Sequence, residues 1–192
     1  MKKLISVITL LTIIICCLTA CGQVDYSTGK HHAEINIKDY GTIKVELDAD
    51  VAPKTVENFA KLVNEGFYDG LTFHRIISGF MIQGGDPAQI GSKKTAKKIE
   101  GEFSKNGIEN NIQHKRGVIS MARTQEYNSA SSQFFIVHQD SFFLDGQYAG
   151  FGNVTEGMEI VDKICGDVHP VDGNGTIGKE EQPVIETIKM VD

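Results

Sequence analysis

The chain is poor in cysteine. Four cysteines occur among its 192 residues, and three of them, Cys16, Cys17 and Cys21, lie near its start. Only Cys165 lies in the remainder, so the main body of the protein has no disulfide framework. The sequence neighbours of Cys165 carry no charge that would lower the pKa of its thiol. We therefore expect Cys165 to pack as a small buried apolar residue rather than to act as a nucleophile.

Positive charge is also scarce. The chain carries 19 Lys and Arg against 25 Asp and Glu, a formal charge of −6. Without Lys2 and Lys3 of the leader described below, 17 basic and 25 acidic residues leave a formal charge of −8. Nucleic-acid binding requires clustered positive charge, so no nucleic-acid partner is expected. A local group of four lysines between Lys93 and Lys98 is interpreted as a solvated face, with contact to anionic lipid or cell-wall polymer as the alternative.

No apolar run is long enough for a membrane-spanning helix, which needs about 20 residues. The longest extends from Leu4 to Ala20, follows two lysines and ends in Leu18-Thr19-Ala20-Cys21. A basic start, an apolar middle and small residues before a cut site predict an export signal over residues 1–20. The final tetrapeptide resembles the lipobox of bacterial lipoproteins. That resemblance implies cleavage before Cys21, lipidation of its sulfur and a mature protein anchored outside the cytoplasmic membrane.

The rest of the chain divides simply. Residues 21–31 are expected to form the lipidated cysteine and a flexible tether, and residues 32–192 a single domain. The latter, roughly 160 residues, are the usual size of one domain with a real core. No internal repeat interrupts them.

The sequence shows no Ser-His or Cys-His pairing and no cluster of metal ligands, which argues against covalent and hydrolytic chemistry. Adjacent His31 and His32 are candidates for weak metal binding, but an exposed place at the entrance of a strand is the favoured interpretation. We expect no metal and no cofactor.

Alternating apolar residues predict antiparallel strands. Residues 33–37 and 43–47 alternate around a break at Asp39-Tyr40-Gly41, which predicts a hairpin. A helix is predicted from Pro53 to a stop near Gly66, and a second from Met158 to Ile164. Further strands are expected at residues 71–77, 80–83, 117–122, 133–137, 149–154 and 184–191. Many short strands and two helices indicate a closed or nearly closed antiparallel barrel.

The run from Phe73 to Asp86 carries the most chemical information. It places one guanidinium, Arg75, and one amide, Gln83, among large apolar side chains and ends in a glycine turn. Such a run can build an apolar pocket with a few fixed donors at its rim. This pocket suits an uncharged substrate whose reaction needs only electrostatic assistance.

Four motifs in register resemble those of the cyclophilins. They are Phe73 to Asp86, Gly117 to Ala122, Ser132 to Ile136, and Leu144-Asp145-Gly146. The resemblance extends from about Ile35 to Val191. It implies a mainly β fold, a closed eight-stranded antiparallel β-barrel capped by two α-helices. It also implies peptidyl-prolyl cis-trans isomerase activity on proline-containing segments of unfolded or exported proteins, by a protein that we expect to be a monomer.

The resemblance also implies roles for individual residues. The catalytic residues would be Arg75, Phe80 and Gln83. The substrate-binding residues would be His74, Met81, Ala122, Arg123, Gln133, Phe135, Phe143, Leu144 and Tyr148. His74 is expected to orient by hydrogen bonding, because amide rotation involves no net proton transfer.

Three of these positions depart from the family pattern. Phe143 stands where many members carry tryptophan, and the missing indole donor bears on cyclosporin binding more than on catalysis. Tyr148 replaces a common histidine and keeps an aromatic surface with a polar tip. Arg123 stands where asparagine is frequent, and its long cation is expected to narrow or recharge the neighbouring subsite.

Two other classes of function compete with the enzyme. A proline-peptide binding module or folding chaperone without turnover would use the same pocket, but Arg75 and Gln83 favour catalysis. A scaffold or adhesion-like surface protein would need no affinity for Xaa-Pro. A lipocalin-like carrier is disfavoured, because the motifs match a barrel whose interior is filled with side chains.

Overall fold

A computed structural model describes residues 24–192 of the chain. The predicted signal at 1–20 and the predicted lipidation site Cys21 lie outside the described residues. Among the helices of the described part, none combines the length and the apolar character needed to cross a membrane.

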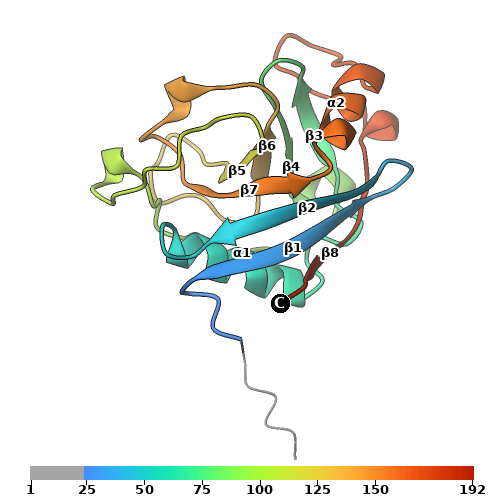
Figure 1. The fold of residues 1–192 in the computed structure, drawn as a ribbon. Helices are drawn as coiled ribbons and strands as arrows, with labels where there is room; N and C mark the ends of the chain where they lie inside the picture. Colours follow the sequence, from blue (N-terminus) through green and yellow to red (C-terminus); the bar gives the residue numbers. More distant parts are fainter. Residues whose placement is uncertain (1–23) are drawn as a thin grey trace, which may run out of the picture.

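Eight antiparallel strands form one curled sheet in the order β3-β4-β6-β5-β7-β2-β1-β8 (Figure 1). The strands are β1 (Lys30–Ile37), β2 (Gly41–Asp48), β3 (Phe73–Ile77), β4 (Met81–Gly84), β5 (Val118–Met121), β6 (Phe134–Val137), β7 (Gly150–Glu156) and β8 (Ile185–Met190). Helix α1 (Pro53–Asn64) packs against β8 and β2, and helix α2 (Met158–Asp167) packs against β2. The predicted strands and both predicted helices are present. Four 3-10 helices, η1 (Pro87–Ile90), η2 (Ser104–Asn106), η3 (Phe142–Leu144) and η4 (Lys179–Glu181), were not predicted.

The two edges of the sheet meet at a single point. An isolated bridge joins Thr72, just before β3, to Val184, just before β8. Backbone hydrogen bonds of 2.8 and 2.9 Å flank this bridge. A mainly β fold with two helices is therefore confirmed, whereas the closed barrel stays a prediction, because β3 and β8 share no ladder in the sheet.

The hydrophobic core explains why the strands could be predicted from the alternation of apolar residues. The apolar residues of the first hairpin, including Ile35, Ile43 and Leu47, are fully buried, while their neighbours in sequence are less so. Phe59 of α1 makes an edge-on contact with Phe134 of β6, with ring centroids 5.7 Å apart. Such aromatic pairs add to the apolar burial that fixes the helix on the sheet. Cys165 is buried as expected, and burial raises the pKa of its thiol to about 11.

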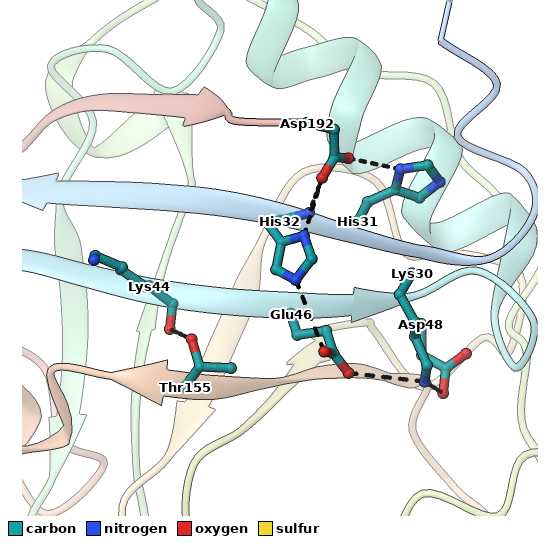
Figure 2. Close-up of polar contacts among 8 residues, drawn as sticks. All are labelled: Lys30, His31, His32, Lys44, Glu46, Asp48, Thr155 and Asp192. Atoms are coloured by element: carbon teal, nitrogen blue, oxygen red, sulfur yellow. Dashed lines mark hydrogen bonds and ion pairs between the residues drawn. The ribbon is translucent and has the colours of Figure 1, made fainter.

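Strand β1 begins earlier than the predicted tether boundary at residue 31. Lys30 and His31 already belong to it, and His31 is buried, contrary to the expected exposed position. The His31 ring lies between Asp192, with Nδ1 2.7 Å from Oδ2, and the Thr28 carbonyl, 2.9 Å from Nε2. His32 is exposed, and its Nδ1 lies 3.0 Å from the other oxygen of Asp192 (Figure 2). One carboxylate thus fastens the start of β1 to the chain after β8.

One of the four grouped lysines has a structural role. The Lys94 ammonium donates to the carbonyls of Gly66 and Phe67, each at 3.0 Å, just beyond the end of α1. Cations are favoured at a helix C-terminus, where carbonyls lack partners within the helix. Lys94 is therefore not available as part of a purely solvated face.

The start of α1 depends on a residue far away in sequence. Ala52 at its N-cap offers no side-chain acceptor. The buried carboxylate of Glu102 accepts instead from the backbone N–H groups of Lys54 and Thr55, at 3.0 and 2.8 Å, and from the Thr55 hydroxyl at 2.7 Å. A carboxylate with three donors at a helix N-terminus satisfies groups that would otherwise be buried without partners.

Replacing this carboxylate should therefore destabilise the fold. Glu102→Gln is expected to lower the free energy of unfolding by about 2–3 kcal/mol, because an amide cannot accept all three hydrogen bonds. Urea unfolding followed by circular dichroism measures the change. The matched control is Glu100→Gln, which removes only the surface partner of Lys54. Equal effects of the two variants would contradict the proposed cap.

Candidate active site

A pocket of about 160 Å³ opens on the face of β3, β4 and β6. Its lining residues are Arg75, Phe80, Met81, Gln83, Ala122, Arg123, Phe135, Leu144 and Tyr148. A second apolar cluster, separate from the main core, contributes Met81, Phe135 and Leu144 to this lining. The pocket therefore has an apolar base that is separate from the main hydrophobic core.

The register of the sheet aligns the central residues of the pocket. Arg75 of β3 lies opposite Gln83 of β4, and Gln83 lies opposite Phe135 of β6. Residues paired across neighbouring strands project from the same face of a sheet. A guanidinium, an amide and an aromatic ring consequently form one row across three strands.

Arg75 is held by three hydrogen bonds, one of them from Nη1 to the Met81 sulfur at 3.8 Å, and it keeps part of its guanidinium free. Its Nε donates to the Asn174 carbonyl at 2.8 Å, and its Nη1 donates to Oε1 of Gln83 at 3.4 Å. Between residues 24 and 192, no carboxylate forms an ion pair with Arg75, and its Nη2 has no hydrogen-bond partner. The guanidinium carbon also lies 6.0 Å from the centre of the Phe80 ring. A permanent cation with free donors thus stands at the edge of an apolar pocket.

Gln83 is fixed on both ends of its amide. Its oxygen accepts from Arg75, and its Nε2 donates to Oε1 of Gln133 at 2.9 Å. The backbone carbonyl of Gln133 accepts in turn from the Ala122 N–H at 2.9 Å. This chain of hydrogen bonds defines which end of Gln83 faces the cation. The side chain can therefore orient Arg75 rather than compete with it.

Aromatic residues form the base and the rim. Phe135 is almost completely buried at the base, whereas Phe143 is 65% exposed. Phe143 is not among the lining residues. Its ring centroid lies 5.4 Å from that of Phe80, which does line the pocket. The pair extends the apolar surface outwards from the pocket. This geometry can hold a small uncharged ring and offer a charged donor to an acceptor beside it.

Arg123 lies against three aromatic rings, and no carboxylate within residues 24–192 forms an ion pair with it. Its guanidinium carbon lies 5.1, 5.1 and 4.6 Å from the ring centres of Phe103, Tyr127 and Tyr148. Its Nε donates to the Gln147 carbonyl at 2.9 Å. Stacking on three rings is a typical use of arginine and would be lost with lysine. Arg123 is half-buried and lines the pocket, where it holds Tyr148 in the wall, and the expected effect of its charge on the neighbouring subsite stays a prediction.

His74 lies outside the pocket lining, although it precedes Arg75 in β3. Its Nδ1 is buried and has no hydrogen-bond partner in the described part of the chain. Burial lowers the pKa of its imidazole, so the ring is neutral at pH 7. Of the twelve residues predicted for catalysis and substrate binding, nine line the pocket and Gln133 and Phe143 contact that lining. Among the twelve, His74 alone neither lines the pocket nor has a recorded contact with its lining.

The expectation that the chain has no Ser-His pairing was wrong. His114 connects Asp145, with Nδ1 2.9 Å from Oδ1, to Ser120, with Nε2 3.0 Å from Oγ. His114 and Ser120 are fully buried, so no substrate can reach the serine hydroxyl and the group cannot act as a nucleophile. The His114 ring stacks on Phe135, at 6.1 Å and 17°. The group therefore supports the pocket from behind.

The sequence did not reveal this support, because Asp145 lies 31 residues from His114 and the six-residue spacing of His114 and Ser120 matches no recognisable motif. The only available signal was the position of Ser120 and Asp145 within the recognised motifs. The Asn174 carbonyl was missed for a different reason. Every residue has a backbone carbonyl, so the residue type does not indicate which one will accept a hydrogen bond.

Comparisons with known proteins agree with this geometry. The family model for "Cyclophilin type peptidyl-prolyl cis-trans isomerase/CLD" matches residues 32–191. Peptidyl-prolyl cis-trans isomerase A of Dickeya dadantii is 43% identical over 169 residues, covering 85% of this chain and 83% of the relative. Peptidyl-prolyl cis-trans isomerase B of Bacillus subtilis is 44% identical over 133 residues, covering 69% and 90%.

Solved structures give the same result. A cyclophilin type peptidyl-prolyl cis-trans isomerase of Cryptosporidium parvum superposes with a TM-score of 0.72 at 28% identity, covering 85% of this chain and 99% of that one. A crystal structure of the same protein in the presence of the dipeptide Ala-Pro superposes with a TM-score of 0.71 at 28% identity, covering 84% and 99%.

The buried histidine behind the pocket should make stability depend on pH. Burial lowers the pKa of His114 below its ordinary value of 6.5, and the hydrogen bond to Asp145 opposes this only in part. The unfolded chain then takes up the proton at a higher pH than the folded chain, so the free energy of unfolding falls as the pH drops below about 6.5. His114→Gln should reduce this slope, and the remainder comes from groups such as His74, whose pKa is also lowered.

Urea unfolding at about pH 7.5 and about pH 5.5 measures the slope for the parent and the variant. His169→Gln, which changes an exposed histidine, is the control. An unchanged slope in His114→Gln would show that this ring is not kept neutral by the fold.

Proposed function

Because the chain belongs to the cyclophilin-type peptidyl-prolyl cis-trans isomerases, we propose that it accelerates Xaa-Pro rotation in exported proteins, with Arg75 as the central catalytic residue. The free part of the Arg75 guanidinium at the edge of an apolar pocket is the observation that carries this proposal.

The reaction itself explains why such a site suffices. Rotation about a peptide bond faces a barrier of about 18–20 kcal/mol, because resonance gives the C–N bond partial double-bond character. For Xaa-Pro the two isomers are close in energy, but they exchange only over tens to hundreds of seconds. In the twisted state resonance is lost, and the proline nitrogen regains a lone pair that can accept a hydrogen bond. The enzyme breaks no covalent bond; it needs only to stabilise the twisted amide.

Each part of the pocket has a role in this proposal. Phe135, Met81 and Leu144 hold the proline ring, and Phe80 closes the pocket beside the guanidinium. Gln83 and Gln133 orient Arg75 and the substrate backbone through the hydrogen bonds described above. A charge-assisted donor aimed at charge that develops in the transition state is worth far more in a dry pocket than in water.

The other residues that were predicted to contact the substrate have secondary roles in this proposal. Ala122 and Tyr148 would line the groove along which the peptide lies, with Arg123 holding Tyr148. Phe143 would extend the apolar surface beyond Phe80. His74 does not line the pocket, so its proposed part is limited to supporting β3.

The site of action is proposed from the start of the sequence. The lipobox-like Leu18-Thr19-Ala20-Cys21 supports a lipid anchor at Cys21 on the outer face of the cytoplasmic membrane. Two acyl chains hold a protein firmly at a membrane, whereas one does so only marginally. Exported chains fold there after translocation, and slow Xaa-Pro exchange can limit that folding. This gives a prolyl isomerase a physical reason to be there.

The cis-trans exchange rate of a short Xaa-Pro peptide, measured by NMR exchange spectroscopy, tests the catalytic role. The protein from Gly22 onward should accelerate exchange, and Arg75→Ala should lower the catalysed rate by about 100-fold, because it removes one transition-state donor. Arg75→Lys keeps the charge but loses the fork of donors, so its catalysed rate should lie between those of the parent and Arg75→Ala.

A folded parent that binds the peptide without accelerating exchange would favour the alternative function, a proline-peptide binding module or folding chaperone. A fully active Arg75→Ala would refute the assignment to Arg75 and leave the family activity in place.

The proposed anchor has its own test. Full-length protein expressed in a bacterium with lipoprotein processing should incorporate labelled fatty acid and partition into detergent. Cys21→Ala should abolish the incorporation, because no other residue offers the thiol at the expected cut site. Cys17→Ala is the matched control and should behave like the parent. Incorporation that survives Cys21→Ala would contradict the anchor.

A further inference from the structure

A tight turn beside the pocket is organised by one carboxylate. Asp172 accepts three hydrogen bonds, from the backbone N–H groups of Asn174 and Thr176 at 2.9 and 3.0 Å and from the Thr176 hydroxyl at 2.9 Å. Aspartate commonly closes turns by accepting from backbone groups two residues on. These bonds favour the charged form, and the pKa of Asp172 is lowered chiefly by the backbone and side-chain hydrogen bonds from Thr176.

This turn lies directly against β3. The Gly175 carbonyl accepts from the Ile76 N–H at 2.8 Å, and Thr176 forms an isolated antiparallel bridge with Arg75. Gly175 has a positive φ of 87°, and a Cβ at this position would lie 2.4 Å from Cγ1 of Ile77. No other residue type fits so close to the strand. The turn is therefore fixed relative to β3 on one side and shaped by Asp172 on the other.

This arrangement fixes the position of one backbone carbonyl, that of Asn174. Asn174, at the tip of the turn, directs its oxygen to Nε of Arg75 at 2.8 Å. The contact to Gln83, at 3.4 Å, is longer, so the Asn174 carbonyl is the stronger restraint on the guanidinium. With Nε held, rotation of the planar group is limited, and Nη2 keeps its place at the pocket edge.

We infer that Asp172 is a positioning residue, which holds the Arg75 guanidinium in its productive orientation through the turn and the Asn174 carbonyl. The inference rests on the proposed catalytic role of Arg75. Asp172 is exposed and does not line the pocket, so it acts on the reaction only through Arg75. Its removal should consequently slow the chemical step and leave peptide affinity unchanged.

Asp172→Ala is the direct test. The exchange rate of a saturating Xaa-Pro peptide on the enzyme is expected to fall about tenfold, since a misplaced catalytic group reduces rate strongly. The Kd of the same peptide, from an NMR titration, should stay within about twofold of the parent value. Asp172→Asn keeps one carbonyl acceptor for the turn and should recover part of the loss. Glu180→Ala, at an exposed residue that has no hydrogen bond or ion pair within residues 24–192, should leave both quantities unchanged.

Two further measurements separate positioning from general damage. The Nε–H signal of Arg75 in an NMR spectrum should shift in Asp172→Ala and not in Glu180→Ala, because its carbonyl acceptor moves. In an Arg75→Ala background, Asp172→Ala should cause no additional loss of rate.

An unchanged rate or an unchanged Arg75 signal in Asp172→Ala would overturn the inference. So would an equal loss in the Arg75→Ala background, or a loss of affinity in place of rate. These results leave the proposed function intact, because that function is judged by the parent and by Arg75→Ala alone.

Discussion

The site depends on a cation, Arg75, that has no carboxylate partner within residues 24–192. Arg75 stands at the edge of an apolar pocket, and its guanidinium is held by a backbone carbonyl and an amide oxygen rather than by a carboxylate. A carboxylate partner would neutralise the charge and occupy the donors, and the pocket would then be only a hydrophobic recess. Neutral acceptors fix the orientation of the group and leave its charge available for a substrate. The surrounding structure can be understood as the means of maintaining this condition.

Several separate parts of the structure keep the Arg75 guanidinium in place beside the pocket. Sheet register places Arg75 beside Gln83, and the buried His114 supports Phe135 from behind. Arg123, a second cation in the pocket lining, packs on aromatic rings and donates to backbone carbonyls, which fixes its place beside Tyr148. The same device, a charge satisfied by groups far away in sequence, recurs at the start of α1, where Glu102 supplies the cap.

Much of the fold could be predicted from local patterns in the sequence, whereas most of the pocket residues were expected only from the resemblance to the cyclophilins. Alternation in the first hairpin, Pro53 at the start of a helix and the run around Arg75 each report on neighbouring residues. The failures concern long-range contacts. His31 contacts Asp192, 161 residues away in the chain, and His114 contacts Asp145, 31 residues away, so both contacts form only when the sheet has folded. The packing of Arg123 likewise depends on rings from three segments. A backbone acceptor such as the Asn174 carbonyl cannot be recognised from residue type at all.

The most direct test of the central claim is a crystal structure of this protein with a short Ala-Pro peptide bound. The account predicts the proline ring on Phe135, with Arg75 within hydrogen-bond reach of the prolyl amide and still bonded to the Asn174 carbonyl. A peptide bound elsewhere would contradict it. So would an Arg75 guanidinium that turns away from the prolyl amide to pair with a carboxylate.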